Sequence, residues 1–405
     1  MPLLASHYSC TGCFTCANLC GKGAITMFAD DEGFLMPQID ASRCMECGLC
    51  ENKCPVLNPL NSNHKNQKAY AIINYADRKN SSSGGAFSLF ARYVLAHKGV
   101  VFGATIDETF QVFHTKIDNV DDLDKLRSSK YVQSVIGDCY EEVKRELRSG
   151  KKVLFTGTPC QVAGLYAFLG KRGEDNLITL DLVCHGVPNH NVFNAYLEKL
   201  KASIRLNNGN GIVTGFRFRK LDSWDYRPAV KFAETKWQLL EQEDNAYMSA
   251  FFKGLIYRES CFRCQYANLN RVGDFTIADF WGIGRHGIPF KKNVSSGVSL
   301  VLDNSGKMKN ILNELEKHAY IEERELREAL IENENLKSPV ERPKFRDSAV
   351  KDFLDENFSL LDYSIKYKLL KKENVKYYVN KYLKNIIYTL GLYNVYKTIT
   401  YKLGK

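Results

Sequence analysis

Two cysteine-rich stretches determine how the first sixty residues fold: CTGCFTCANLC at residues 10–20 and CMECGLCENKCP at residues 44–55. In each stretch three cysteines recur at every third position, and a fourth follows four residues later. Three thiolates at this spacing wrap a loop around one corner of an iron–sulfur cubane, and the fourth reaches a neighbouring cluster. The repeat therefore predicts a ferredoxin-type module with two [4Fe–4S] clusters.

The fourth cysteine of each stretch is expected to bind the cluster held by the other stretch, and this predicts which thiolates share a cluster. One predicted set is Cys10, Cys13, Cys16 and Cys54, and the other is Cys44, Cys47, Cys50 and Cys20. Two structural zinc sites are the alternative, but four cysteines in this register, found twice, favour cubanes. Gly21 stands where a proline usually follows the first run, which changes a turn and removes no ligand. Adjacent clusters of this kind exchange electrons, so we expect the module to conduct them.

The composition is that of a globular protein with room for two or three domains: 405 residues, 44% hydrophobic and 25% charged. No stretch approaches the roughly 18 consecutive apolar residues of a membrane-spanning helix. The first residues also lack the basic start and apolar centre of a secretory signal. Most of the 13 cysteines fall in clusters or short motifs, which is typical of thiolate ligands in a reducing compartment. We therefore expect a cytoplasmic protein.

Three regions follow one another along the chain. Residues 1–60 are the ferredoxin-type domain, residues 66–335 form a central domain, and residues 336–405 form a basic helical tail. In the central domain we expect strands at residues 69–75, 100–105, 152–155, 177–182, 216–219, 275–278 and 298–302, and helices at residues 86–97, 161–169 and 191–201. Strands that alternate with helices predict a mixed α/β or α+β fold for this domain.

Five cysteines lie outside the ferredoxin-type domain, and four of them occur in short motifs: TGTPCQ at residues 156–161, CHGVP at residues 184–188 and CFRC at residues 261–264. A cysteine where a strand meets a glycine- or proline-containing turn can present a thiolate. Four such thiolates could hold a further [4Fe–4S] cluster. Buried structural cysteines with a zinc knuckle are the alternative, and the spacing alone leaves both open.

Further motifs connect the chain to a known family. These are SSSGG at residues 81–85, SKYVQS at residues 129–134 and RVGDFTIADFWG at residues 271–282, together with TGTPCQ and CHGVP. With them the sequence, from about residue 8 to about residue 305, resembles the coenzyme F420 hydrogenase/dehydrogenase beta-subunit family. More narrowly, it resembles the bacterial branch with an N-terminal ferredoxin domain, which is associated with polysaccharide biosynthesis. Members of this family are iron–sulfur flavoproteins that bind FAD.

The resemblance implies particular roles for residues of the central domain. It implies that Cys160, Cys184, Cys261 and Cys264 hold a third [4Fe–4S] cluster near the flavin, which leaves Cys139 as a packing residue. The resemblance also implies the residues that bind the cofactor: Ser82, Ser83, Gly84, Gly85, Ser129, Lys130, Tyr131, Gln133, Ser134, Thr156, Gly157 and Thr158. His185 is a weak candidate for a proton donor beside the flavin, with a structural hydrogen bond as the alternative.

Simple chemistry supports part of this flavin site. Residues 81–85 precede a predicted helix at Ala86, and a helix N-terminus with hydroxyls and glycines can hold a diphosphate. A capped surface turn is the plainer alternative. Lys130 could pair with a phosphate or with the pyrimidine end of the flavin. We expect Asp274 or Asp279 to hold Arg271 or an N–H near the site, and Trp281 to pack in the core. No GxGxxG motif follows a strand, so a Rossmann-type site is not expected.

The tail carries most of the net charge of +10. From Lys366 onward it has ten lysines and a single acidic residue, Glu373, while apolar residues between Val375 and Leu390 form one stripe of a predicted helix. Such a helix can dock on the protein itself, on an acidic partner, or on an anionic membrane surface at the inner face of the membrane. Nothing else supports binding to nucleic acid.

These observations predict an oxidoreductase that depends on FAD and iron–sulfur clusters. Electrons from ferredoxin or another low-potential donor would enter through the two N-terminal clusters and reach an organic substrate. The resemblance suggests a sugar or sugar nucleotide of a surface polysaccharide as that small-molecule substrate. Two alternatives remain: a subunit that transfers electrons to a partner enzyme without a substrate of its own, and an enzyme that uses F420.

Overall fold

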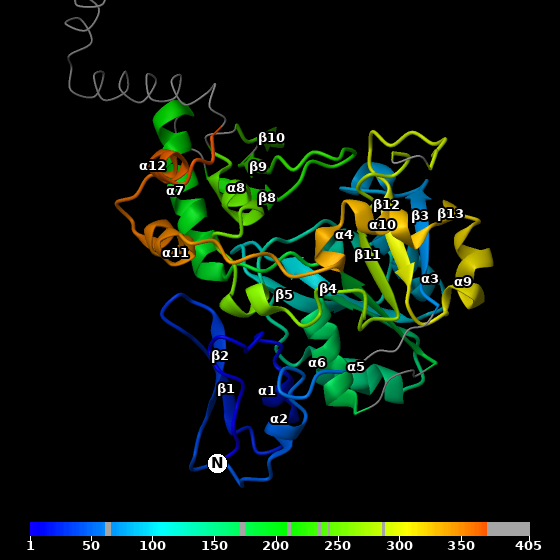
Figure 1. The fold of residues 1–405 in the computed structure, drawn as a ribbon, viewed down its shortest axis with the longest axis horizontal. Coiled ribbons are helices and arrows are strands. Elements are labelled where there is room, and N and C mark those ends of the chain that lie inside the picture. Colours follow the sequence, from blue (N-terminus) through cyan, green and yellow to red (C-terminus); the bar gives the residue numbers. More distant parts are fainter. Residues whose placement is uncertain are drawn as a thin grey trace, which may run out of the picture.

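The computed structural model describes residues 1–60, 66–170, 175–208, 212–233, 236–241, 244–285 and 288–370. Figure 1 shows three parts: the ferredoxin module at the bottom, a large sheet at the right, and a mostly helical unit at the upper left. The predicted mixed α/β architecture with a ferredoxin-like N-terminal module is confirmed. The apolar stripe predicted between residues 375 and 390 lies outside the described residues.

The ferredoxin module consists of two short helices and a hairpin. Helices α1 (Thr15–Leu19) and α2 (Leu49–Asn52) each follow a cysteine loop, and strands β1 (Ile25–Ala29) and β2 (Leu35–Ile39) pair antiparallel.

The two cysteine loops have the same backbone conformation. Gly12 and Phe14 in the first loop and Glu46 and Gly48 in the second all have positive φ angles, between 55° and 71°. Residues with side chains rarely adopt this conformation. Its occurrence two and four positions after the first cysteine of each loop shows that both stretches turn in the same way, as the sequence repeat predicted.

An eight-stranded mixed sheet forms the centre of the molecule, in the order β13-β3-β12-β11-β7-β6-β4-β5. Its strands are β3 (Lys68–Asn74), β4 (Val100–Ile106), β5 (Val112–Ile117), β6 (Val153–Gly157), β7 (Leu177–Leu182), β11 (Phe275–Asp279), β12 (Ser299–Asp303) and β13 (Ala319–Arg324). Strands β4, β6, β7 and β11 run parallel to their neighbours in this series, and the remaining pairs are antiparallel.

Helices cover both faces of this sheet because its strands are apolar on both sides. On one face, α3 (Ala86–Ala96) and α9 (Met308–Leu315) pack against residues such as Val101 and Leu154. On the other, α5 (Cys139–Arg148) and α6 (Pro159–Leu169) cover the next residues along the same strands, and α10 (Leu326–Ile331) covers β3 and β12. The short elements α4 (Leu123–Leu126), η1 (Arg78–Asn80) and η3 (Glu334–Leu336) lie in connecting loops.

The third part has its own core, which is rich in aromatic side chains. It is built from α7 (His190–Asn208), α8 (Ala246–Phe252), α11 (Arg346–Leu354), α12 (Leu360–Lys366) and a small sheet of β8 (Val213–Arg217), β9 (Ala229–Phe232) and β10 (Gln238–Leu239). Thus α11 and α12, which belong to the region predicted as a tail, pack with α7 and α8 in one core. No described helix is long and apolar enough to cross a membrane.

A buried arginine joins the ferredoxin module to the rest of the protein. Arg258 is only 2% exposed, and its guanidinium donates from Nε to the carbonyl of Cys10 (2.7 Å) and from Nη2 to that of Leu35 (2.9 Å). Glu32 in the turn between β1 and β2 forms an ion pair with Arg346 of α11. Tyr140 of α5 also donates to the carbonyl of Cys13 (2.9 Å), so the module is fixed against both other parts of the molecule.

A second buried ion pair sets the positions of β7 and β11. Arg271 Nη2 donates to Asp181 Oδ1 (2.8 Å), and Asp181 Oδ2 accepts from the backbone N–H of Gly273 (2.9 Å). Asp274 and Asp279 were expected to hold Arg271 or an N–H near the site, and the second alternative is the one found. Asp274 pairs with Lys307 and accepts from the backbone N–H of Thr179 (3.0 Å), and Asp279 pairs with Arg219 and accepts from Trp224 Nε1 (3.0 Å). The sequence alone does not show that Asp181 is the partner of Arg271, because Asp181 approaches Arg271 only through the pairing of β7 with β11.

We predict that Arg271→Met lowers the free energy of unfolding by about 3–5 kcal/mol, because it leaves the carboxylate of Asp181 buried without its counter-ion. Denaturant titration followed by circular dichroism would measure the change. Arg327→Met is the matched control, since the Arg327 side chain is 73% exposed. An exposed ion pair contributes at most about 1 kcal/mol. Equal losses in the two variants would contradict the prediction.

Candidate redox sites and ligand cavity

The first predicted ligand set is brought together in the ferredoxin module. Burial raises the pKa of the Cys16 thiol, and the neighbouring sulfurs of Cys13, Cys10 and Cys54 raise it further. Cys54 comes from the second cysteine stretch, so the fourth cysteine crosses to the first stretch as predicted. The backbone N–H groups of Gly12 and Ala17 point at the sulfurs of Cys10 and Cys16.

The second predicted set gathers beside the first and closer to solvent. Burial raises the pKa of Cys50, and the sulfurs of Cys47 and Cys20 contribute to the increase. Cys20, which comes from the first cysteine stretch, therefore joins cysteines of the second stretch, the reverse of what Cys54 does. Cys47 is exposed, and Cys44 lies near the amino group of Met1. The two groups are neighbours, because the sulfur of Cys50 also raises the pKa of Cys54.

The four cysteines expected to hold a third cluster also meet. Cys160 is in the first turn of α6, Cys184 follows β7, and Cys261 and Cys264 lie within and just after η2 (Glu259–Arg263). Burial raises the pKa of Cys184, as do the sulfurs of Cys261, Cys160 and Cys264. Burial and the sulfur of Cys264 raise the pKa of Cys261 to about 12.

Cys139 lies apart from these three groups. It begins α5, is buried, and belongs to the apolar core between the sheet, α5 and α6. This placement agrees with the packing role expected for it.

All three groups have the chemistry of iron–sulfur ligands. Crowded thiolates repel one another, which raises their pKa values, and a cationic iron core would offset this repulsion. Backbone N–H groups reach the sulfurs in each group, for example from Ala24 to Cys20 and from Gly186 to Cys184; such bonds tune iron–sulfur clusters. In the described residues no three His, Cys, Asp or Glu side chains are placed to hold a single metal ion.

The three groups and a cavity form a continuous series. The sulfur of Cys13 raises the pKa of Cys160, so the first group adjoins the third. Cys184 belongs to the third group and also lines a cavity of about 280 Å³. The order from the surface inward is therefore the Cys20/44/47/50 group, the Cys10/13/16/54 group, the Cys160/184/261/264 group and the cavity.

The cavity lies where the parallel strands end. Thr158 follows β6, Cys184 follows β7 and Asp279 ends β11, and all three line it. The carboxyl ends of parallel strands are the usual ligand-binding edge of an open α/β sheet. The antiparallel strands β12 and β3 bring Ser299 and the start of α3 to the same edge.

Most of the predicted cofactor-binding residues line this cavity. Ten of the twelve do so: Ser82, Ser83, Gly85, Ser129, Lys130, Tyr131, Ser134, Thr156, Gly157 and Thr158. Gly84 instead touches the sheet, because a Cβ atom there would lie 2.1 Å from the carbonyl of Ile72. Gln133 donates to the carbonyl of Thr11 (2.8 Å) and so contacts the ferredoxin module.

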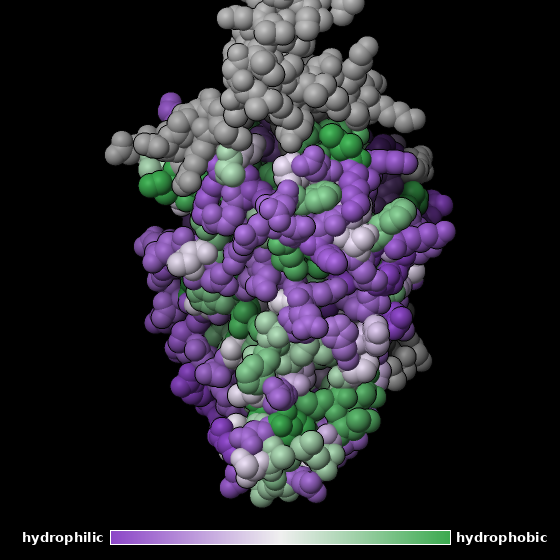
Figure 2. Space-filling model, turned by 90° about the vertical axis from the view of Figure 1, so that its left-hand side faces the viewer, coloured by the Kyte–Doolittle hydropathy of each residue, from purple (hydrophilic) through white to green (hydrophobic). Residues whose placement is uncertain are grey.

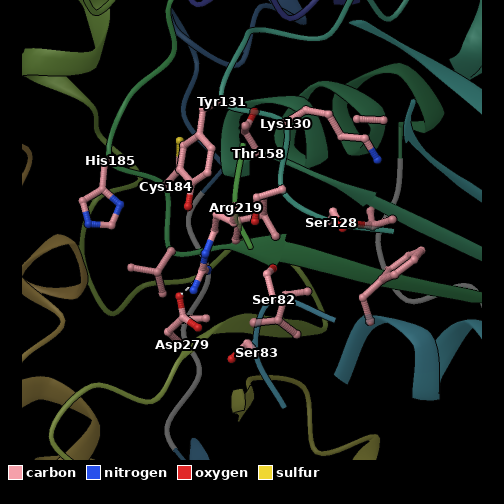
Figure 3. Close-up of a pocket in the computed structure, with 18 of the residues that line it drawn as sticks. Ser82, Ser83, Ser128, Lys130, Tyr131, Thr158, Cys184, His185, Arg219 and Asp279 are labelled. Carbon is pink, nitrogen blue, oxygen red and sulfur yellow. Dashed lines mark hydrogen bonds and ion pairs between the residues drawn. The ribbon is translucent and has the colours of Figure 1, made fainter. Parts of the chain in front are cut away.

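One side of the cavity is suited to phosphate. The serines before α3 stand at its N-terminus, and Lys130 lies across from them (Figure 3). Lys130 Nζ donates to the carbonyl of Arg127 (2.7 Å), and burial lowers the pKa of Lys130 to about 7. His114, which also lines the cavity, is neutral at physiological pH, because burial lowers its pKa to about 4 despite the opposing hydrogen bond with the carbonyl of Thr156.

The other side holds Asp279, which was expected near the site, together with Arg219 and aromatic residues that no motif had connected with it. Asp279 accepts from Arg219 Nη1 (2.8 Å) and Trp224 Nε1 (3.0 Å), and the Arg219 guanidinium stacks on the ring of Tyr226 at 4.4 Å. Trp281, expected in the core, lines the cavity and packs on Trp224. The one sequence feature that pointed to this side of the cavity was the position of Asp279, directly after the strand predicted at residues 275–278.

His185 lies on this second side, next to Cys184 (Figure 3). Burial lowers the pKa of His185, and the carboxylate of Asp279 opposes this effect. The ring is therefore mainly neutral near pH 7, a state in which it can both donate and accept a hydrogen bond.

The residues of this cavity fit FAD. Serine hydroxyls and a helix N-terminus can hold a diphosphate, while Tyr131, Tyr226 and Trp281 provide flat apolar surfaces. The Nε and Nη2 atoms of Arg219 are buried without a hydrogen-bond partner in the described part of the chain. Such unsatisfied donors are rare in proteins and indicate a missing acceptor.

Two family models match parts of the chain. Residues 150–329 match the family model for the C terminus of the beta subunit of coenzyme F420 hydrogenase/dehydrogenase. Residues 9–58 match the 4Fe–4S dicluster domain. The family resemblance and the two-cluster module predicted from the motifs are thereby confirmed. No curated protein matches the chain.

One solved structure is a distant match. It is a chain of the F420-reducing [NiFe] hydrogenase complex from Methanosarcina barkeri, with 15% sequence identity and a TM-score of 0.44. The alignment covers 76% of the present chain and 94% of the other.

We predict that the amine of Lys130 is half neutral near pH 7. Only a neutral amine attacks an acylating reagent, so labelling of Lys130 by acetic anhydride should reach half its maximum near that pH, as followed by mass spectrometry. Exposed lysines titrate near 10.4 in model peptides and should react some three units higher. Labelling of Lys130 that rises only in parallel with the exposed lysines would contradict the prediction.

Proposed function

We propose that this chain, whose residues 150–329 belong to the coenzyme F420 hydrogenase/dehydrogenase beta-subunit family, moves electrons between a protein partner and an organic substrate in the cavity. The iron–sulfur module provides the surface end of the path, and the third cysteine group provides the inner end. A bound FAD would interconvert single electrons and a hydride equivalent, which is the chemistry that flavins supply.

One observation carries this proposal: Cys184 is shared between the third cysteine group and the cavity wall. A redox centre held by this group would therefore adjoin a ligand in the cavity. The group also adjoins the ferredoxin module through Cys160 and Cys13. A protein that only bound a ligand would have no use for such a series.

Side chains between the groups keep them in place. Tyr140 donates to the carbonyls of Cys13 (2.9 Å) and Gln161 (2.8 Å), and Tyr266 donates to that of Pro55 (2.7 Å). Both phenols are buried, and they connect the first cysteine loop, α6 and the second cysteine loop. Their packing excludes water from the interval between the first and third groups.

The exposed end of the path has a surface suited to a protein partner. Met45 is 63% exposed, Leu3 is 68% exposed, and Leu49 adjoins the exposed Cys47. Figure 2 shows apolar residues gathered at the lower end of the molecule, where Figure 1 places this module. We therefore propose that ferredoxin or another low-potential carrier docks on this apolar tip, formed by Leu3, Met45 and Leu49.

The chemical class of the substrate rests on the family resemblance. Its narrower form, the bacterial branch associated with polysaccharide biosynthesis, supports a sugar or sugar nucleotide. The second candidate is a subunit that hands electrons to a partner enzyme, and the third is an enzyme that uses F420. Incubation of the reduced protein with F420 and with sugar nucleotides would separate them, since a relay subunit would reoxidise with neither.

We predict about twelve irons and one flavin in anaerobically purified protein, as three [4Fe–4S] clusters and FAD require. The double variant Cys184→Ser/Cys261→Ser should lose about four irons while its N-terminal clusters remain, because it removes half of the third ligand set. Iron analysis and the absorption spectrum would measure this.

Cys139→Ser is the matched control, because Cys139 is buried yet lies outside the three groups. It should keep all of its iron. A wild-type protein with about eight irons and no flavin would overturn the proposal in favour of a simple relay.

We predict that Met45→Lys slows reduction by ferredoxin about tenfold, because it places a charge at the centre of the apolar tip. Stopped-flow absorbance would measure the second-order rate constant. Phe28→Lys is the control, since Phe28 is 52% exposed on β1, outside both cysteine loops. If the small reductant dithionite is slowed equally, the substitution has altered the cluster and the docking proposal fails.

A further inference from the structure

The buried guanidinium of Arg219 has an unused hydrogen-bonding edge. Arg219 is 2% exposed and lies two residues beyond the end of β8. Its Nη1 atom donates to Asp279 and the hydroxyl of Tyr131 faces the guanidinium, but no acceptor lies within hydrogen-bond distance of Nε or Nη2 among the described residues. Arg219 lines the cavity and lies at the centre of Figure 3, but its Nε and Nη2 atoms are covered, so a ligand there reaches them only when the neighbouring side chains move aside.

The charge of this guanidinium is maintained by its surroundings. Burial acts to lower the pKa of Arg219, but the carboxylate of Asp279 and the phenols of Tyr131 and Tyr226 outweigh burial and raise it. Arg219 is therefore a cation at every physiological pH. Leaving two donors of a buried cation unsatisfied is costly, so the site is complete only when an acceptor occupies it.

The geometry of the unused edge limits what can bind. Nε and Nη2 present two nearly parallel N–H groups in the plane of the guanidinium. They match a ligand edge with two adjacent acceptors, as arginine reads the ring nitrogen and carbonyl of guanine. The flavin ring has such an edge, formed by N1 and the C2 carbonyl, and the flat side chains of Tyr131 and Tyr226 lie beside Arg219.

Lys130 is less suited to this role than the sequence suggested. Its ammonium donates to the carbonyls of Arg127 (2.7 Å) and Lys125 (3.3 Å), and it points away from Arg219 (Figure 3). Lys130 and Arg219 therefore lie at different ends of the cavity, and Cys184, Ser82 and Ser83 lie at the Arg219 end.

We propose that Arg219 donates from Nε and Nη2 to the N1–C2 carbonyl edge of the flavin ring. This inference rests on the proposed binding of FAD. This contact orients the ring toward Cys184 and the phosphates toward Lys130. Because reduction adds negative charge at this edge, Arg219 raises the reduction potential of the bound flavin. Asp279 is a positioning residue that holds the guanidinium and partly neutralises it.

The test compares FAD affinity and flavin midpoint potential in Arg219→Gln, Arg219→Lys and Asp279→Asn. Arg219→Gln should bind FAD at least about tenfold more weakly and at a lower potential, because a charge-assisted bidentate contact is lost. Arg219→Lys should lie between Arg219→Gln and the wild type. Asp279→Asn should raise the potential, because it removes the opposing negative charge; disruption of the fold would not produce shifts of opposite sign.

Two controls define what would overturn the inference. Arg217→Gln changes a nearby arginine, the last residue of β8, which stacks on Trp237 and lies outside the cavity lining, and it should leave both quantities unchanged. ADP carries the phosphates without the ring, so it should bind Arg219→Gln and the wild type equally.

An equal loss of ADP affinity would assign Arg219 to the phosphates and overturn the inference. Unchanged FAD affinity and midpoint potential in Arg219→Gln would assign Arg219 to an anionic substrate and would likewise overturn the inference. A wild-type protein that binds ADP but no flavin would overturn the proposed function itself.

Discussion

Mutual repulsion among thiolates is the constraint on which this structure depends. Twelve cysteines meet in three groups, and in each the burial and crowding of sulfur disfavour the ionised form. Without a bound cation such sulfurs remain neutral thiols, and a cation together with backbone N–H donors is what would let them ionise and act as ligands. The tight loops, the crossing of Cys20 and Cys54, and the convergence of α6, β7 and η2 all serve this arrangement. The fold of the ferredoxin module is largely the path that a short chain must take to surround two such centres.

The position of the ligand cavity follows from the same arrangement. Cys184 follows a central parallel strand, so the third group lies at the carboxyl edge of the sheet. The first turn of α3 and the loops after β6 and β11 reach this edge as well. An electron path and a binding pocket therefore meet because parallel strands end together, and no separate element is needed to join them.

The sequence allowed much of this to be predicted, and its failures have physical causes. Cysteine spacing was sufficient for the ferredoxin module because ligand geometry there is local. Strand β7 was predicted with its observed bounds, since leucine and isoleucine fill four of its six positions, as in a buried strand. Arg219 was read as the end of a strand and was not connected with Asp279, 60 residues away. The partner of Arg271 was missed for the same reason: polar side chains find partners through strand pairing, which a single sequence does not display.

The attachment of the ferredoxin module has a consequence for how the protein meets its partners. Arg258 donates to the backbone of both the first cysteine loop and β2, and Glu32 is held by Arg346 from the far side. A domain clamped in this way cannot swing like the mobile arm of a carrier protein. The distance between the exposed Cys47 and the cavity is then constant, so a redox partner has to come to the module and cannot be reached by a movement of it.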